Sequence, residues 1–389
     1  MNDNQKLDLA NVPQELKVIL KLLRTSNVND ELYSDIDWDL FIQQVIHHRV
    51  FPLVYPLFKK YDGGVIPKQI IEQLSYLYKQ NTFKMLFLTA EMENISRFFT
   101  EAKMPLIFLK GPIIAHELYG DVSFRTSSDL DFIIPIEHLT RAEEILVNIG
   151  YVKDDYFKSV LNDWKWRHHH VTFFHPQKKL KIEIHWRLHP GPGVEPKFQE
   201  LWSRRVKSKL TSYPVYMLGK EDLFVFLVVH GARHGWSRIR WLFDIHRLAE
   251  QSVDWIEVNK LLRKYQSYNA GAQALILSSK LFNTKIKEPM KALIKNKRAK
   301  ALAQDAIFYL ERMVNLHTDP VPKEVFSYHS HHLFSLMTKR QKLMYILSIV
   351  HPFAEDAEVF PLPKLFHFLY FPLRPFIVFW RKKRKHVIS

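Results

Sequence analysis

The sequence contains no cysteine, which excludes disulfide bonds, thiolate metal ligands and a thiolate nucleophile. Glycine is scarce, with 11 residues in a chain of 389, so the sequence favours helices over strands joined by tight glycine turns. We find no internal repeat and no low-complexity segment. The first residues, Met1 to Lys6, are polar and lack the apolar stretch of a secretory signal, so we expect a cytoplasmic protein.

Acidic residues are fewer than basic ones, with 40 Asp and Glu against 56 Lys and Arg, which gives a formal net charge of +16. The excess extends beyond the five consecutive cations Arg381 to Lys385. Such a charge suits polyanionic partners, namely nucleotides, nucleic acid or an anionic membrane surface, and it equally suits a protein that is simply basic. Hydrophobic residues make up 47% of the chain, so we expect folded domains, two or three in number.

A short apolar run at 106–109 is followed by Lys110, Gly111 and Pro112. The run predicts a buried strand that ends at this turn. Pro112 suits the first position of a helix, because its missing N–H would have no partner there, and residues 113–119 continue with helical spacing. A strand that leads into a helix N-terminus offers free backbone N–H groups to a phosphate, so we expect an anion site at Gly111 with the Lys110 ammonium beside it.

Asp129 and Asp131 open the next apolar run. Side chains alternate along a strand, so both carboxylates lie on one face while Leu130 enters the core. Two carboxylates about 4 Å apart repel by roughly 4 kcal/mol at an effective dielectric near 20, so a cation is needed between them. Mg²⁺ is suited to this role because it takes carboxylate oxygens together with substrate phosphates.

Lys110-Gly111, Arg125 and Asp129-Leu130-Asp131 together resemble the motif of the uncharacterised nucleotidyltransferase family within the DNA-polymerase-β-like superfamily. That superfamily places a Gly-Ser turn at a helix start, an Asp-x-Asp pair on the following strand and a third carboxylate on a later strand. Here Pro112 stands in place of the serine, and Gly111 is further from Asp129 than is usual. The resemblance implies an α+β fold, with a small mixed β-sheet nucleotidyltransferase core flanked by N-terminal and C-terminal helical regions.

Two further strands are predicted at 168–175 and 180–186. In the second, Lys181, Glu183 and His185 share one face. Spacing alone leaves Glu183 as an ordinary surface carboxylate, whereas the similarity of 182–186 to the later-strand motif of the family makes it the third carboxylate. Three histidines, 168–170, begin the first strand; since strand neighbours alternate, we expect at most His168 and His170 to converge, and a zinc site there is a minor alternative.

The regions on either side of the predicted core are helical. On the N-terminal side, helices are expected at 38–47 and 70–100, with two prolines interrupting 50–57 and with 47–49 packing at a helix end rather than touching substrate. On the C-terminal side, helices are expected at 222–233 and 236–250. We divide the chain into an N-terminal helical region (1–100), the nucleotidyltransferase α/β core (101–218), a C-terminal helical domain (219–350) and an aromatic and basic tail (351–389).

His230 and His234 are spaced i, i+4 near the junction of these two C-terminal helices. This spacing can hold zinc, but the adjacent glutamate of a metalloprotease motif is absent. Packing, substrate contact and metal binding therefore stay open for the pair. The segment 238–245 also resembles the helical part of the nucleotidyltransferase family, where it lines the cleft against the catalytic sheet.

The tail combines an aromatic, apolar segment at 365–380 with the cluster of five cations. Arg374 and two prolines make it a poor transmembrane helix. Two interpretations remain equal: the segment docks at an anionic membrane surface, or it covers an apolar groove of the body.

The resemblance implies an enzyme that moves a nucleoside monophosphate from an NTP to an unidentified hydroxyl acceptor and releases pyrophosphate. The implied catalytic and metal-binding residues are Asp129, Asp131 and Glu183, with two Mg²⁺ ions and Mn²⁺ as the alternative metal. The expected substrate-binding residues are Lys110, Gly111, Arg125, Ser127, Ser128, His185, His230, Arg238, Arg240 and Asp244. Two alternatives are an inactive nucleotide-binding or membrane-associated scaffold of the same fold, and a toxin-like transferase that modifies RNA ends.

Overall fold

A computed structural model describes residues 7–28, 33, 35–61, 64–154 and 159–387, without the side chains of 381–387. The expectation about a secretory signal rests on Met1 to Lys6, and the expectation about the tail rests partly on the side chains of Arg381 to Lys385. Both lie outside the described part of the protein. The centre of the fold is a mixed seven-stranded sheet in the order β3-β4-β5-β2-β1-β7-β6. Its strands are β1 (Ile107–Phe108), β2 (Asp129–Ile133), β3 (Val152–Asp154), β4 (His170–His175), β5 (Leu180–His185), β6 (Val206–Lys207) and β7 (Tyr216–Met217).

The pairing of β2 with β5 positions the acidic residues. The two strands are parallel, and their register sets Asp131 beside Glu183 and Asp129 beside Lys181. The alternate residues Leu130 and Ile182 are fully buried in the core, which fixes this register because a slip by one residue would expose them. The predicted sharing of one face by the carboxylates is confirmed.

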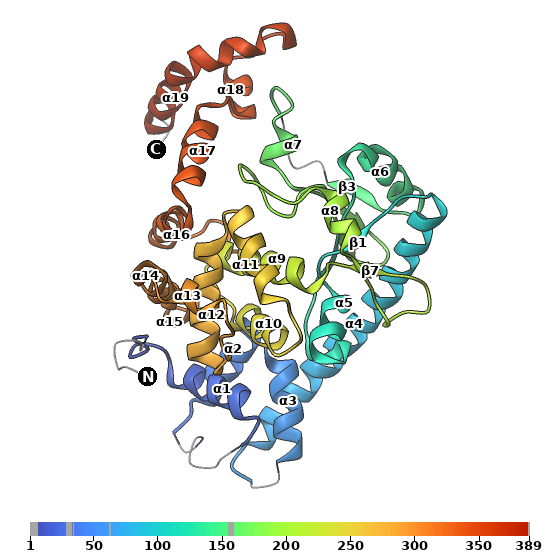
Figure 1. The fold of residues 1–389 in the computed structure, drawn as a ribbon, viewed down its shortest axis with the longest axis vertical. Coiled ribbons are helices and arrows are strands. Elements are labelled where there is room, and N and C mark those ends of the chain that lie inside the picture. Colours follow the sequence, from blue (N-terminus) through green and yellow to red (C-terminus); the bar gives the residue numbers. More distant parts are fainter. Residues whose placement is uncertain (1–6, 29–32, 34, 62–63, 155–158, 388–389) are drawn as a thin grey trace.

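The N-terminal helices are α1 (Gln14–Thr25), α2 (Trp38–His47), α3 (Phe51–Lys60) and α4 (Lys68–Glu101). The predicted interruption at 50–57 is wrong, because α3 continues through both of its prolines. Pro52 lies in the first turn, where no N–H partner is needed, and Pro56 removes a single internal hydrogen bond. The 34-residue helix α4 runs from the N-terminal helices along the sheet and contacts α3, α6 and β2 (Figure 1).

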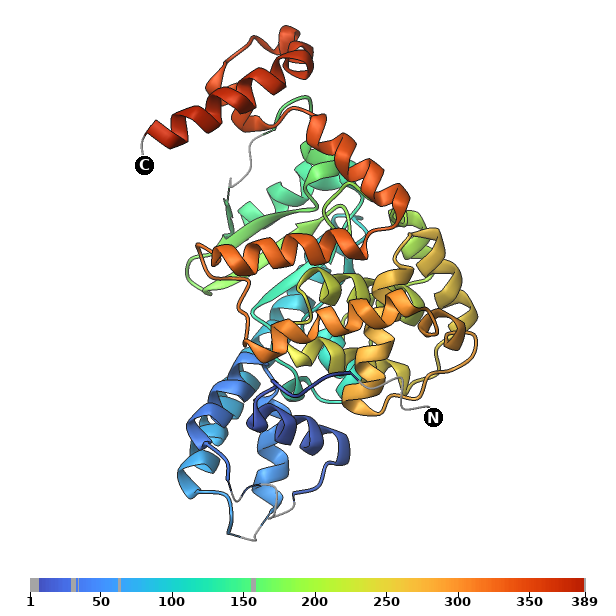
Figure 2. The same ribbon diagram turned by 90° about the vertical axis from the view of Figure 1, so that its left-hand side faces the viewer.

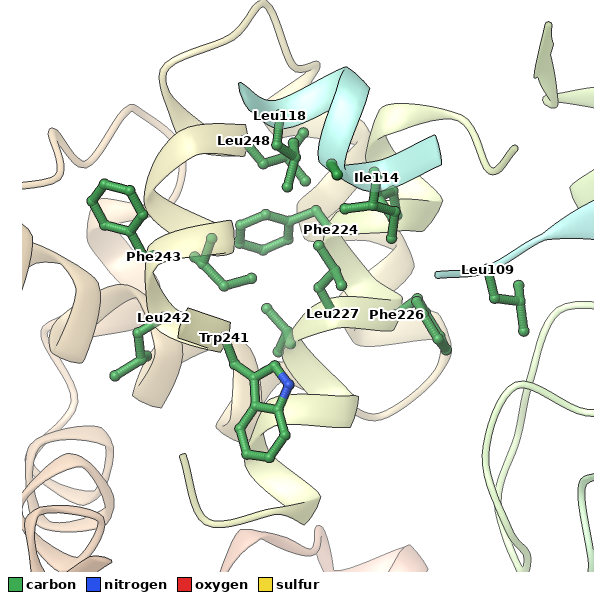
Figure 3. Close-up of a cluster of buried hydrophobic side chains, with 14 of the residues drawn as sticks. Leu109, Ile114, Leu118, Phe224, Phe226, Leu227, Trp241, Leu242, Phe243 and Leu248 are labelled. Atoms are coloured by element: carbon green, nitrogen blue, oxygen red, sulfur yellow. The ribbon is translucent and has the colours of Figure 1, made fainter. Parts of the chain in front are cut away.

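The helices after the first strand build the rest of the body. Figure 3 shows α5 (Pro112–Tyr119) packing against α9 (Lys220–Arg233) and α10 (Ile239–Ala249) through Ile114, Leu118, Phe224 and Leu248. These helices confirm the predicted α+β fold with helical regions on both sides of the sheet. The remaining body helices are α6 (Leu139–Asn148), α7 (Trp164–Arg167), α8 (Phe198–Ser203), α11 (Trp255–Lys264), α12 (Tyr268–Phe282), α13 (Lys291–Ile294), α14 (Lys297–Asp305) and α15 (Ile307–Glu311), with 3₁₀ turns at Val122–Phe124 and Ile136–His138.

The turn between α9 and α10 depends on Gly235, whose φ is +60° and whose Cα faces the ring of Tyr309. In Gly235→Ala the new methyl group would overlap that ring on a backbone that L-residues disfavour, so we expect a loss of about 3 kcal/mol in the free energy of unfolding. Urea denaturation measures it. Gly120→Ala is the control, because φ is +78° there but no atom lies within 4 Å; it should lose about 1 kcal/mol. Equal losses in both variants would contradict the role of Tyr309.

The last helices are α16 (Lys323–Leu336), α17 (Lys339–Val350), α18 (Ala354–Val359) and α19 (Tyr370–Val387), with a 3₁₀ turn at Lys364–Leu369. In both ribbon views α18 and α19 lie at the end of the molecule opposite to the N-terminal helices (Figures 1 and 2). Within the tail, Tyr370 and Ile377 pack with Val160 in a small separate core, whereas Leu365 is 80% and Phe376 74% exposed. Most of the described side chains of 365–380 are exposed, and the choice between an apolar groove and a membrane surface stays open.

Among the helices of the described residues, we find none with the length and apolar character needed to cross a membrane. Contact of the tail with a membrane surface and the four domain boundaries stay predictions.

Candidate active site

A cavity with a volume of about 440 Å³ lies between the β2–β5 pair and the helices on its two sides. The strands and the turns beside them contribute its carboxylates, three histidines and two lysines. The helical regions contribute further histidines, most of the arginines and aromatic rings. The acidic and histidine residues are Asp129, Glu183, His169, His170, His185, His230, His234 and His317, and the cationic ones are Arg49, Lys110, Arg125, Lys181, Arg233, Arg238 and Arg240.

Asp131 lies behind this wall and is fully buried. Its Oδ1 atom accepts from Lys110 Nζ at 3.1 Å and from His185 Nε2 at 3.2 Å. Burial raises the pKa of Asp131 to about 6, although the Lys110 ammonium opposes the shift. Its second oxygen, Oδ2, is buried and has no hydrogen-bond partner among the described residues, so this carboxylate keeps capacity for one further ligand.

Glu183 lies next to Asp131 through their shared contact with His185, whose Nε2 is 3.4 Å from Glu183 Oε2. The Lys181 ammonium is 2.6 Å from Glu183 Oε1 and 3.9 Å from Asp129 Oδ2. The predicted third carboxylate is therefore close to the aspartate pair. Burial would raise the pKa of Glu183, but the hydrogen bond and charge of His185 hold it below its usual value.

The ring of His185 is fixed on both sides, since its Nδ1–H donates to the Arg187 carbonyl at 3.3 Å. Burial lowers the pKa of His185, and its hydrogen bonds to Asp131 and Glu183 raise it above the usual value. His185 therefore connects two of the three carboxylates and orients both.

The histidine tract differs from its prediction, because His169 and His170 converge rather than His168 and His170. His169 Nε2 lies 3.1 Å from His170 Nδ1, and both rings contact His185. The reason is that β4 begins at His170, so the alternation of a strand does not yet apply to His169. Burial lowers the pKa of His170 to about 3 and that of His169 further, so both rings are neutral and able to bind a metal.

Arg125 and Asp244 form a buried ion pair beside the cavity. Arg125 Nε donates to Asp244 Oδ1 at 3.0 Å, Arg125 Nη2 donates to Oδ2 at 3.0 Å, and the Tyr119 hydroxyl donates to Oδ1 at 2.7 Å. Asp244 is buried and does not line the cavity, so it does not lie where substrate contact was expected. It holds Arg125 in place instead. Arg240 similarly donates to the hydroxyl and carbonyl of Thr126.

The surroundings of Gly111 differ from those expected of a phosphate-binding turn. The residue has φ +98°, a conformation that glycine adopts easily, but it is buried against the Leu130 side chain and the Asp129 carbonyl and does not line the cavity. The helix start at Pro112 is buried as well. The expected phosphate site on this turn therefore has no opening, because the packing that anchors β2 closes it.

The other expected substrate-binding residues reach the cavity: Lys110, Arg125, Ser127, Ser128, His185, His230, Arg238 and Arg240 all line it. His230 and His234 contact each other and the ring of Trp241, with ring centroids 4.7 Å apart between the histidines. Burial lowers the pKa of both, so they form an aromatic, uncharged patch of the wall. Their roles stay predictions.

Sequence reasoning missed Arg49 and His317, which also line the cavity. Arg49 had been placed at a helix end, and the preceding His47 and His48 do pack there, on Ser237 and Ile239. The local sequence indicated the position of Arg49 only weakly, by a cation that directly follows His47 and His48 at the end of a helix. His317 gave no signal, because only the folding of the later helices brings it to the site.

A mixed sheet that brings an Asp-x-Asp pair and a glutamate to a cavity lined with cations is the arrangement of a nucleotidyltransferase. The model of the family described as uncharacterised nucleotidyltransferase matches residues 34–283, which is more than half of the chain. The chain belongs to this family. A search of curated proteins finds no match.

Three solved structures show similarity. ANT(2'')-Ia in complex with adenylyl-2''-tobramycin is 13% identical, with a TM-score of 0.34, and the match covers 46% of this chain and 97% of that one. A nucleotidyltransferase-like protein from Paracoccidioides brasiliensis is 16% identical, with a TM-score of 0.32 and coverages of 54% and 97%. JHP933 from Helicobacter pylori is 17% identical, with a TM-score of 0.24 and coverages of 67% and 98%.

Proposed function

We propose that this nucleotidyltransferase uses Asp129, Asp131 and Glu183 in a metal-dependent transfer of a nucleoside monophosphate from an NTP to a hydroxyl acceptor, with release of pyrophosphate. The observation that carries the proposal is the β2–β5 register, which gathers three carboxylates at the edge of a cavity that seven cationic side chains also line. Three carboxylates so close together repel unless a cation joins them.

The donor set fits a divalent metal ion. Oxygen and nitrogen atoms of Asp131, Glu183 and His185 lie within 4.8 Å of one another, and Asp131 Oδ2 is buried without a hydrogen-bond partner among the described residues. Carboxylates suit Mg²⁺ and Mn²⁺, and His185 would add a nitrogen ligand once its Nε2 gives up the proton that it donates to Asp131. A bound metal supplies positive charge to the reacting phosphate and lowers the pKa of the acceptor hydroxyl.

The side chains of the protein have separate tasks in this proposal. Lys110 and Lys181 neutralise the carboxylates until substrate arrives, since each ammonium contacts one or two of them. His185 keeps Asp131 and Glu183 in fixed positions. Arg125, held by Asp244, adds fixed positive charge beside the cavity, where negative charge develops on the leaving group.

Incubation of the protein with each labelled NTP, Mg²⁺ and a cell extract tests the proposal. We expect label from one or more NTPs to appear on an acceptor, together with pyrophosphate. Release of the NDP in place of pyrophosphate, with the γ-phosphate on the acceptor, would indicate phosphoryl transfer and contradict the proposal.

Metal binding gives a test that needs no acceptor. Glu183→Gln removes a charged ligand from the set, so we expect its affinity for Mg²⁺ or Mn²⁺, measured by titration calorimetry, to fall by about tenfold or more. Glu144→Gln is a matched control, because it is the same change at a glutamate that is exposed on α6 and does not line the cavity. Equal affinities in the wild type and Glu183→Gln would favour an inactive scaffold of the same fold.

A further inference from the structure

Three arginines of the cavity wall, Arg49, Arg233 and Arg238, form no ion pair with a carboxylate among the described residues. Arg125 is bound by Asp244, and Arg240 donates through Nη1 to Thr126 while its Nε is buried without a partner among the described residues. Arg238 makes only a distant contact with the Trp241 ring, its guanidinium 5.6 Å from the ring centroid. Burial lowers the pKa of Arg233 and the nearby Glu195 opposes this, whereas the nearby Arg49 adds to the lowering of the pKa of Arg238. Arg49 and Arg238 are therefore the pair of neighbouring arginines that gains most from an anionic ligand.

These two side chains come from segments that are tied together. His47 Nε2 donates to the Ser237 carbonyl at 3.1 Å, and the Ile239 N–H donates to His48 Nδ1 at 3.3 Å. His48 is fully buried, and Arg49 follows it with φ +56°, a conformation uncommon for a residue other than glycine. The packing of α2 on the start of α10 thus directs Arg49 into the same cavity as Arg238.

The wall is electrostatically unfavourable without an anion. Burial and the nearby Arg49 lower the pKa of Arg238 to about 10. Burial also lowers the pKa of Arg49; Asp129 opposes this shift, and Arg125 adds to it. Neighbouring guanidinium groups disfavour each other's charged form, so a ligand with two or more negative charges stabilises both of them.

The backbone turn expected to bind phosphate cannot serve this purpose, because Gly111 is buried behind Leu130. Guanidinium groups bind phosphate oxygens in pairs and stay charged at neutral pH. We propose that Arg49 and Arg238 form the binding site for the β- and γ-phosphates of the NTP, and that they hold pyrophosphate after the transfer. This inference rests on the proposed function for the identity of the anion.

The charge balance of the reaction is consistent with this placement. The acceptor oxygen forms a bond to the α-phosphorus, the bond from that phosphorus to the β-bridging oxygen breaks, and the electron pair leaves with pyrophosphate. The hydroxyl proton passes to solvent. The two arginines would add positive charge where the leaving group gains negative charge, in the same cavity as the carboxylates proposed to bind the metal.

Binding of inorganic pyrophosphate to the full chain, measured by titration calorimetry, tests the site without turnover. We expect Arg49→Gln and Arg238→Gln each to weaken binding by about tenfold to hundredfold, as typical for the loss of a charged hydrogen-bond donor. Arg49→Lys should recover part of the loss because the charge returns. Arg263→Gln is the control, since it removes one positive charge from an exposed position on α11 and should leave binding unchanged.

The outcomes separate this inference from the proposed function. Wild-type affinity in Arg49→Gln and Arg238→Gln, in variants whose circular dichroism and melting temperature match the wild type, would overturn the site. If NTP transfer occurs and Arg49→Gln leaves its KM unchanged, the site is also overturned while the function stands. If no NTP is transferred but pyrophosphate binding still requires both arginines, the anion site stands and the function falls.

Discussion

Asp129→Asn and Asp131→Asn should each abolish nucleotidyl transfer, with kcat reduced by about a thousandfold or more, because a neutral amide neither offsets a metal ion nor balances the surrounding cations. Asp129→Asn is the easier variant to interpret, because its effect on stability should be small. The Asp129 side chain is 21% exposed, and its ion pair with Lys181 is long, at 3.9 Å. Label transfer from the preferred NTP under saturating metal measures the effect.

Two controls show whether the loss of activity comes from the active site or from a damaged fold. Asp129→Asn should keep the circular dichroism spectrum and melting temperature of the wild type, and Asp154→Asn, at an exposed carboxylate on β3, should keep full activity. Retained turnover in both active-site variants would refute the metal-binding roles of the pair.

The second large effect is on stability. Asp244→Ala should lower the free energy of unfolding by about 3–5 kcal/mol, because it leaves the Arg125 guanidinium buried without its carboxylate and removes the acceptor of the Tyr119 hydroxyl. Arg125 and Asp244 expose only 3% and 1% of their side chains, so water cannot replace the lost contacts. Urea denaturation followed by circular dichroism measures the change.

An exposed ion pair provides the comparison. Arg312 and Glu324 are 52% and 70% exposed, so Glu324→Ala should cost less than about 1 kcal/mol. If Asp244→Ala lowered the free energy of unfolding as little as Glu324→Ala, the buried ion pair would not stabilise the cavity wall.

The strands and the acidic group could be predicted because their signals are local. Alternation along 129–133 and 180–185 decides which side chains face the core, and this pattern alone places Glu183 on the same side as Lys181 and His185. Long helices such as α4 are equally evident from an uninterrupted run without glycine or proline.

The errors arose where tertiary packing decides the result. Gly111 has the local features of a phosphate site, but nothing in its own segment shows that Leu130 covers it. The position of His169 depended on where β4 begins, and the tolerance of α3 for Pro56 depends on the packing of the whole helix. Arg49 reaches the cavity through contacts with residues about 190 positions away, as the hydrogen bond from His47 to Ser237 shows.

The walls of the cavity come from segments spread between Arg49 and His317, so no contiguous part of the chain contains them all. During synthesis on the ribosome, the acidic strands emerge long before the later helices that complete the pocket. The nascent chain therefore passes through a stage in which the carboxylates and four of the seven cations that line the cavity are present without Arg233, Arg238 and Arg240. Contacts between such distant segments form slowly, and chaperones that shield early intermediates should raise the yield of active protein.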